Sequence, residues 1–100
     1  MKMYIAIKEW VPTGYAVNCA AHAGLIGWLS FQEHQDTQDW LKNSFKKVTC
    51  IVTEEEFIEL KKIEHSKIIT ESRLENDEIG IVFAPRKEWP PIMKTLRLWK

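Results

Sequence analysis

Cysteine, glycine and proline are all scarce in this chain of 100 residues, which has two cysteines, four glycines and four prolines. Two cysteines are too few for a disulfide framework, and a structural zinc site usually needs four regularly spaced ligands. Cys19 and Cys50 both lie in apolar stretches. We therefore expect two reduced, buried thiols, as is usual in a reducing compartment, and no cofactor.

Long apolar runs are absent as well. The first apolar run ends at Lys8 and Glu9, which is too early for a signal peptide. No uninterrupted apolar stretch reaches the roughly 18 residues that a membrane-spanning helix needs. These absences predict a cytoplasmic protein that does not associate with membranes.

An excess of charge of one sign is also lacking, because 14 Lys and Arg residues balance 14 Asp and Glu residues. Zero net charge argues against avid, non-specific binding of nucleic acid, which depends on a basic field. A local basic patch around Lys46 and Lys47 stays open, beside the simpler interpretation that these are solvated surface lysines.

The residues that are present suffice for one core, since 45% are hydrophobic and five are Trp. We expect a single domain over residues 1–100. Apolar periodicity predicts strands near residues 3–8, 45–52, 67–70 and 79–84, and an edge strand near the C-terminus. It predicts helices over 14–31, over 36–41 with Asp36 as N-cap, and from the capping box Thr53–Glu56 onward. Strands that alternate with helices indicate an α/β layered domain whose sheet is at least partly parallel.

The stretch "GYAVNCAAHAGLIGWLSF" forms the longest predicted helix. One side, expected to lie close on the sheet, carries Val17, Ala20, Ala21, Gly24 and Trp28. A second stripe near the helix N-terminus carries Tyr15, Asn18, Cys19 and His22. Because α/β proteins tend to place ligands at strand–turn–helix openings, this stripe is the first candidate site.

Three segments resemble, in the same order along the chain, the type 2 peptidyl-tRNA hydrolases. "GYAVNCAAHAG" looks like the family's first helix, with Ala20, His22 and Ala23 matching its A-x-H-A element. "FKKVTCIVTEEEFIEL" is similar to its K-K-V strand and acidic helix start, and "IVFAP" to a later strand. The resemblance implies a mixed sheet of four to five strands with helices on both faces. It also implies tRNA or peptidyl-tRNA as a partner and metal-independent ester hydrolysis.

Residue by residue, the resemblance carries His22 over directly. Tyr15 stands where the family has a lysine, Cys19 where it has a glutamine, and Glu71 where it has an aspartate. It implies His22 and Glu71 as catalytic residues. The residues expected to bind substrate are Tyr15, Asn18, Cys19, Lys47 and Ser72, with Tyr15 and Ser72 around the pocket and Lys47 on the basic face. A phenol cannot replace the fixed positive charge of a lysine, so two functions stay in view: a non-catalytic binding module that uses the first-helix pocket, and an ester hydrolase.

Several residues keep a simpler interpretation beside the functional one. Cys19 and His22 could form a thiolate–imidazole pair, or Cys19 could be a core residue and His22 could bond to Asn18. Glu71 could be a general base, or it could pair with Arg73 or cap a turn.

Two further groups are interpreted as structural. Glu33, His34 and Asp36 are expected to form a solvated loop rather than a metal cluster. The last two tryptophans, Trp89 and Trp99, are expected to be partly exposed; packing is the simpler role for them, and a homodimer interface the alternative.

Overall fold

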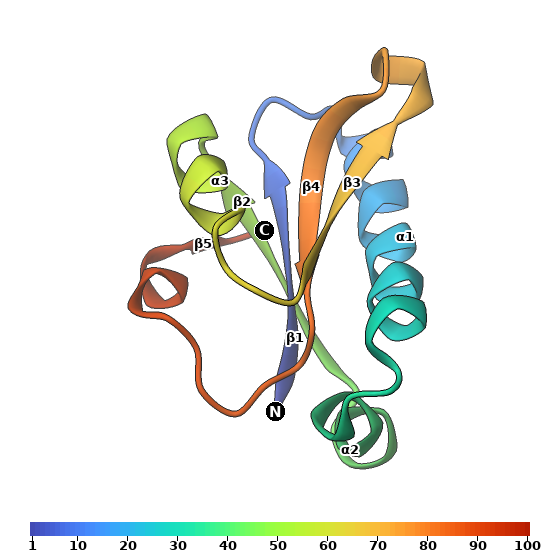
Figure 1. Ribbon diagram of the computed structural model, residues 1–100. Coiled ribbons are helices and arrows are strands. Elements are labelled where there is room, and N and C mark those ends of the chain that lie inside the picture. Colours follow the sequence, from blue (N-terminus) through green and yellow to red (C-terminus); the bar gives the residue numbers. More distant parts are fainter.

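The computed structural model describes residues 1–100, which form five strands, three α-helices and two short 3-10 helices (Figure 1). In chain order they are β1 (Lys2–Lys8), α1 (Thr13–Phe31), α2 (Gln35–Asn43), β2 (Lys46–Val52), α3 (Glu54–Leu60), β3 (Ser66–Glu71), η1 (Ser72–Leu74), β4 (Asp77–Phe83), η2 (Pro91–Thr95) and β5 (Arg97–Leu98).

One mixed sheet joins all five strands in the order β3-β4-β1-β2-β5. β1 and β2 are parallel, with Lys2 opposite Lys46 and Lys8 opposite Val52. β4 is antiparallel to β1 and to β3, and β5 is antiparallel to β2. β1, β2 and β3 therefore run in the same direction, and their carboxyl ends share one edge of the sheet. The expected fold class, α/β with a mixed sheet of four to five strands, is confirmed.

Helices cover both faces of this sheet. α1 packs on β1, β3 and β4, while α3 lies on the opposite face. Figure 1 shows the sheet between these two helices, with α1 on the right and α3 on the left. One apolar cluster, which includes Met3, Ile5 and Ile7, lies beneath α1. A second cluster, which includes Phe57 and Phe83, lies beneath α3.

The face of α1 that lies on the sheet differs from the predicted one. Its buried residues are small or apolar: Ala16, Cys19, Ala23, Gly27 and Phe31. Val17, predicted to face the sheet, is 62% exposed, and Ala21 is exposed as well. The prediction was wrong because α1 is apolar around most of its circumference, so periodicity alone does not mark the buried side.

Close approach of α1 to the sheet depends on Gly80 in β4. A Cβ atom at position 80 would lie 2.7 Å from the Sγ of Cys19 and 3.0 Å from the backbone oxygen of Ala6. Glycine is thus the residue that lets the helix and the strand come this near to each other.

The N-cap predicted from the sequence is found in the structure at α3 but not at α2. The Thr53 side chain accepts a hydrogen bond from the Glu56 N–H, and the Glu56 side chain accepts one from the Thr53 N–H. The predicted capping box is therefore confirmed. For α2 the N-cap is His34, and Asp36 lies in the first turn, so the predicted Asp36 cap is wrong.

Candidate functional site

Glu71 ends β3 at the carboxyl edge of the sheet and binds its own turn. Its Oε2 atom accepts hydrogen bonds from the Arg73 N–H at 2.9 Å and from the Ser72 hydroxyl at 3.4 Å. Of the alternatives for Glu71, the turn cap is confirmed. The carboxylate and Ser72 lie together, as the sequence predicts. Their hydrogen bond is part of the N-terminal cap of η1.

Cys19 points into the interior and is 1% exposed. Burial, with a smaller contribution from the negative charge of Glu71, raises the pKa of its thiol to about 11. A nucleophilic cysteine needs the opposite shift, toward a stable thiolate. The interpretation of Cys19 as a nucleophile is therefore contradicted, and the core interpretation is confirmed. Buried as it is, the side chain does not line a pocket either.

The rest of the predicted stripe on α1 divides between solvent and core. His22 and Asn18 are exposed, and no side-chain hydrogen bond joins them. Tyr15 is half-buried and packs against the apolar cluster beneath α1. Because Cys19 points inward while His22 points outward, the structure does not join these two residues in one catalytic pair.

Lys47 lies far from Glu71, at the amino end of β2. It is level with Met3 of β1, whereas Glu71 lies beyond the level of Lys8, about 20 Å farther along the strand direction. The Lys47 ammonium donates to the Phe45 carbonyl at 2.9 Å and lies 3.3 Å from the centroid of the Phe45 ring. Its partial burial lowers the pKa of Lys47. Lys47 and Glu71 therefore do not lie in one pocket, and the role of Lys47 in substrate binding stays a prediction.

A polar cluster that sequence reasoning missed surrounds a cavity of about 450 Å³. The imidazoles of His34 and His65 meet edge to face there, with centroids 4.9 Å apart. Arg86 donates to the Ala84 and His65 carbonyls, each at 3.0 Å. No group of three His, Cys, Asp or Glu side chains in the chain is placed to hold a metal. The cluster comes from three parts of the chain, around His34, His65 and Arg86. These parts are distant in sequence, so no local spacing predicts that they meet.

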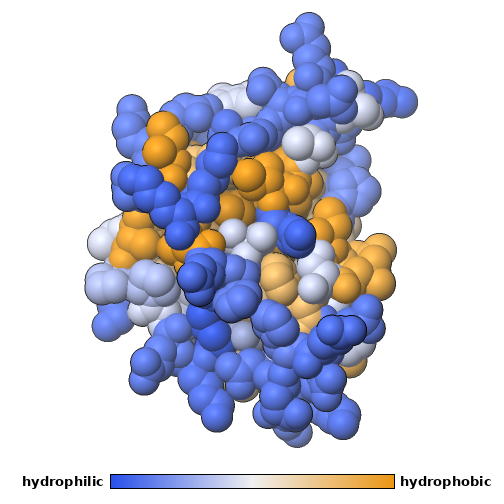
Figure 2. Space-filling view, in the orientation of Figure 1, coloured by the Kyte–Doolittle hydropathy of each residue, from blue (hydrophilic) through white to orange (hydrophobic).

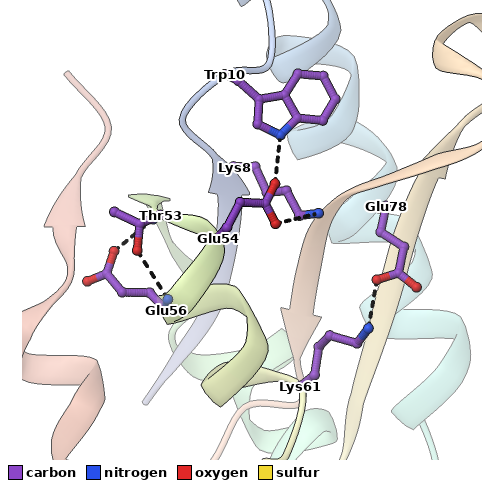
Figure 3. A network of polar contacts seen from close by, with 7 residues as sticks. All are labelled: Lys8, Trp10, Thr53, Glu54, Glu56, Lys61 and Glu78. Atoms are coloured by element: carbon purple, nitrogen blue, oxygen red, sulfur yellow. Dashed lines mark hydrogen bonds and ion pairs between the residues drawn. The ribbon is translucent and has the colours of Figure 1, made fainter.

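A second polar network ties α3 to β1 (Figure 3). The Lys8 ammonium lies 3.2 Å from the Glu54 carboxylate, which also accepts a hydrogen bond from the Trp10 indole at 3.0 Å. Hydrogen bonds from Lys8 and Trp10 lower the pKa of Glu54. Lys8 is only 8% exposed and lies over the Phe57 ring, 4.5 Å from its centroid. This network pairs a buried lysine and anchors the first turn of α3.

An apolar groove runs along the side of α1 that faces β2. Near the start of the helix it contains a cavity of about 250 Å³ lined by Ile7, Ala16, Val17, Ala20, Thr49 and Trp99. Near the end of the helix it contains one of about 360 Å³ lined by Gly24, Leu25, Trp28, Trp40, Leu41, Phe45 and Lys47. We call these two cavities together the α1 groove. It lies there because α1 packs mainly on β1, β3 and β4 rather than on β2.

The outer side of α1 is also apolar. Val17, Leu25 and Leu29 are 62%, 60% and 56% exposed. No Asp, Glu, Lys or Arg occurs from Trp10 to Gln32. In the view of Figure 2, apolar side chains gather over the middle of the molecule and over α1 at the right, with hydrophilic side chains above and below. An exposed helix normally carries charged residues on its solvent side.

The two late tryptophans are both half-buried, as predicted, but they lie on opposite faces of the sheet. Trp89 packs edge to face on Tyr4, with ring centroids 4.6 Å apart, in the cluster beneath α3. Trp99 lines the α1 groove. They therefore do not form one exposed surface.

Comparison with known proteins found no family model and no curated protein that matches this chain. None of its helices is both long enough and apolar enough to cross a membrane.

Proposed function

We propose that this protein is a non-catalytic interaction module, diverged from the type 2 peptidyl-tRNA hydrolases that its sequence resembles. Its binding surface is the exposed side of α1 together with the α1 groove. The observation that carries the proposal is a helix of 19 residues that contains no charged residue, although much of it faces solvent. Exposed contiguous apolar surface of this kind marks interaction sites in monomeric domains.

The placement of the candidate catalytic residues supports binding over hydrolysis. Ester hydrolysis without a metal needs a base within hydrogen-bond reach of water, and positive charge near the developing oxyanion. The Glu71 carboxylate is hydrogen-bonded within its own turn, and His22 has no polar partner. Lys47 lies near the amino ends of the parallel strands, whereas Glu71 lies at their carboxyl ends. No lysine or arginine stands in the first turn of α1.

The first experiment tests hydrolysis by incubating excess protein with purified peptidyl-tRNA in a single turnover, beside an active type 2 hydrolase. We expect no release of tRNA above background. Release that is lost in Glu71→Gln or His22→Ala would overturn the proposal and establish the hydrolase.

The second experiment tests the surface with the uncharged apolar dye Nile red at low micromolar protein concentration. We expect the folded protein to bind the dye, and Val17→Lys to weaken binding about tenfold because a lysine then stands in the groove wall. The matched control is Ile58→Lys on α3, since Ile58 is 56% exposed on the opposite face. Equal dye binding by all three proteins would contradict the proposed surface.

A further inference from the structure

Arg86 carries a positive charge that has no counter-ion within the chain. Its guanidinium donates from Nε to the Ala84 carbonyl and from one Nη atom to the His65 carbonyl, each at 3.0 Å. No ion pair of the chain includes Arg86. Partial burial lowers the pKa of its guanidinium, against an opposing effect from the charge of Glu64. Because a partly buried charge is normally paired, a counter-ion is expected from outside the chain.

The guanidinium is held in one orientation and keeps free donors. Its two bonds to carbonyls fix one edge of the group, and its central carbon lies 4.7 Å from the centroid of the Trp89 ring. A guanidinium has five N–H groups in a planar fork, and these two bonds use two of them. The remaining N–H groups are free to bind the oxygens of an anion.

Two imidazoles lie in the wall of the same cavity. His34 and His65 line this cavity of about 450 Å³ together with Arg86. Phe31, which is 6% exposed, packs against both rings, with centroid distances of 5.5 Å to His34 and 6.4 Å to His65. The His65 carbonyl accepts from the Ala84 N–H as well as from Arg86. An imidazole offers one N–H when neutral and two when protonated, so the cavity has three donor groups in its wall.

Asp36 is the acidic residue in the wall of this cavity. Its carboxylate makes no ion pair with Arg86 or with either histidine. It therefore does not neutralise the guanidinium by direct contact, although its charge opposes an anion in the cavity. Removal of this charge should strengthen the binding of an anion, which supplies a test.

The donor set favours a phosphoryl group over a carboxylate. A phosphoryl group has three strong acceptor oxygens and close to two negative charges at neutral pH, whereas a carboxylate has two oxygens and one charge. We infer that Arg86, His34 and His65 bind a phosphoryl group. The cavity volume lies within the range of about 300–1,000 Å³ typical of small-molecule sites, so it also has room for an organic group. The site shares no residue with the α1 groove, and the inference does not depend on the proposed function.

Proton NMR tests the inference, because the chain has three histidines and the third, His22, lies on α1 outside this cavity. The Hε1 resonances are followed while inorganic phosphate or ribose 5-phosphate is added at constant pH and ionic strength. We expect the resonances of His34 and His65 to shift saturably at millimolar concentrations, and that of His22 to stay in place. Tighter binding of ribose 5-phosphate identifies a phosphomonoester as the ligand, and tighter binding of inorganic phosphate identifies the free ion. Resonances that stay unchanged at tens of millimolar of both probes would refute the inference.

Variants locate the bound group. Arg86→Gln should weaken phosphate binding at least about tenfold, because it removes the charge and the fork of donors. The matched control is Lys87→Gln, which removes the same charge from the exposed neighbouring residue and should bind like the wild type. Since Arg86→Gln also loses two hydrogen bonds of the fold, Asp36→Asn, which keeps them, gives a second measurement and should tighten binding about threefold.

Three results would overturn the site. Equal binding by Arg86→Gln and Lys87→Gln would mean that the guanidinium does not hold the phosphoryl group. Binding that Asp36→Asn does not tighten would place the group outside this cavity. Acetate that shifts the resonances of His34 and His65 as strongly as phosphate would mean that the cavity selects a carboxylate.

Discussion

Replacing Gly80 by alanine tests how α1 is held against the sheet. Gly80 has a backbone conformation that alanine can also adopt, because no glycine of this chain has a positive φ. If nothing opposed the new methyl group, the variant would gain about 0.4–1 kcal/mol from the reduced entropy of its unfolded chain. The structure predicts the opposite sign, because the methyl group would lie 2.7 Å from the Sγ of Cys19.

The size of the effect follows from what can move. Sγ is fixed close to the helix backbone, and the second contact, 3.0 Å to the backbone oxygen of Ala6, belongs to the central strand β1. Overpacking of a core without flexible neighbours costs about 1–3 kcal/mol. We therefore expect Gly80→Ala to lower the free energy of unfolding by about 1–2 kcal/mol, which shifts the Tm down by roughly 5–15 °C in a domain of this size.

A double-mutant cycle isolates the contact with Cys19. Cys19→Ala removes the sulfur and should itself cost about 1 kcal/mol through the small cavity that it leaves. In that background, Gly80→Ala should cost at least about 1 kcal/mol less than in the wild type. Urea denaturation at low micromolar protein concentration measures all four free energies.

The control is Gly14→Ala, in the first turn of α1. No atom lies within 4 Å of the added Cβ, so we expect a gain of about 0.5–1 kcal/mol. A Gly80→Ala variant as stable as the wild type would refute the reasoning. So would additive effects in the cycle, because they would show that Cys19 does not oppose the methyl group.

Two further predictions concern titratable groups. Alkylation of Cys19 should be negligible in the folded protein at pH 8 and fast in urea, because the thiol is buried and its pKa is raised to about 11; native labelling with a pKa near the ordinary value of about 8.5 would contradict this. Glu54→Gln should cost about 1 kcal/mol at neutral pH, since it removes the charge that pairs with Lys8 but keeps an acceptor for Trp10. The pKa of Glu54 is lowered by these two partners from its ordinary 4.5, so its stabilisation is complete above pH 4.5 and disappears as the pH falls below that value. Urea denaturation of both proteins between pH 6 and 3 should show the difference between their free energies of unfolding shrinking. A constant difference would mean that the charge of the Glu54 carboxylate does not stabilise the fold.

Local patterns in the sequence were enough to predict most elements. Alternation in β1, the apolar runs of β2 and β4, and the Thr53–Glu56 capping box each depend on interactions within a few residues. The burial of both cysteines also followed from their apolar neighbours. These features could be predicted because their causes lie close together in the chain.

The candidate site could be predicted only in part. Glu71 and Ser72 are adjacent in sequence, and the structure keeps them together. Whether Lys47 joins them depends on strand direction: β2 and β3 run the same way, so a residue near the start of one lies far from the end of the other. The pairing of His34 with His65 likewise depends on how distant loops meet.

By itself, then, the sequence determined that residues 14–31 form a long uncharged helix, because composition and length suffice for that. Only the tertiary structure decided how that helix is rotated. An apolar residue stands at nearly every angle around α1, so hydrophobicity favours no single face. Steric fit against Gly80 selects the side with Cys19. That choice exposes Val17, Leu25 and Leu29, and thereby creates the surface to which we assign the function.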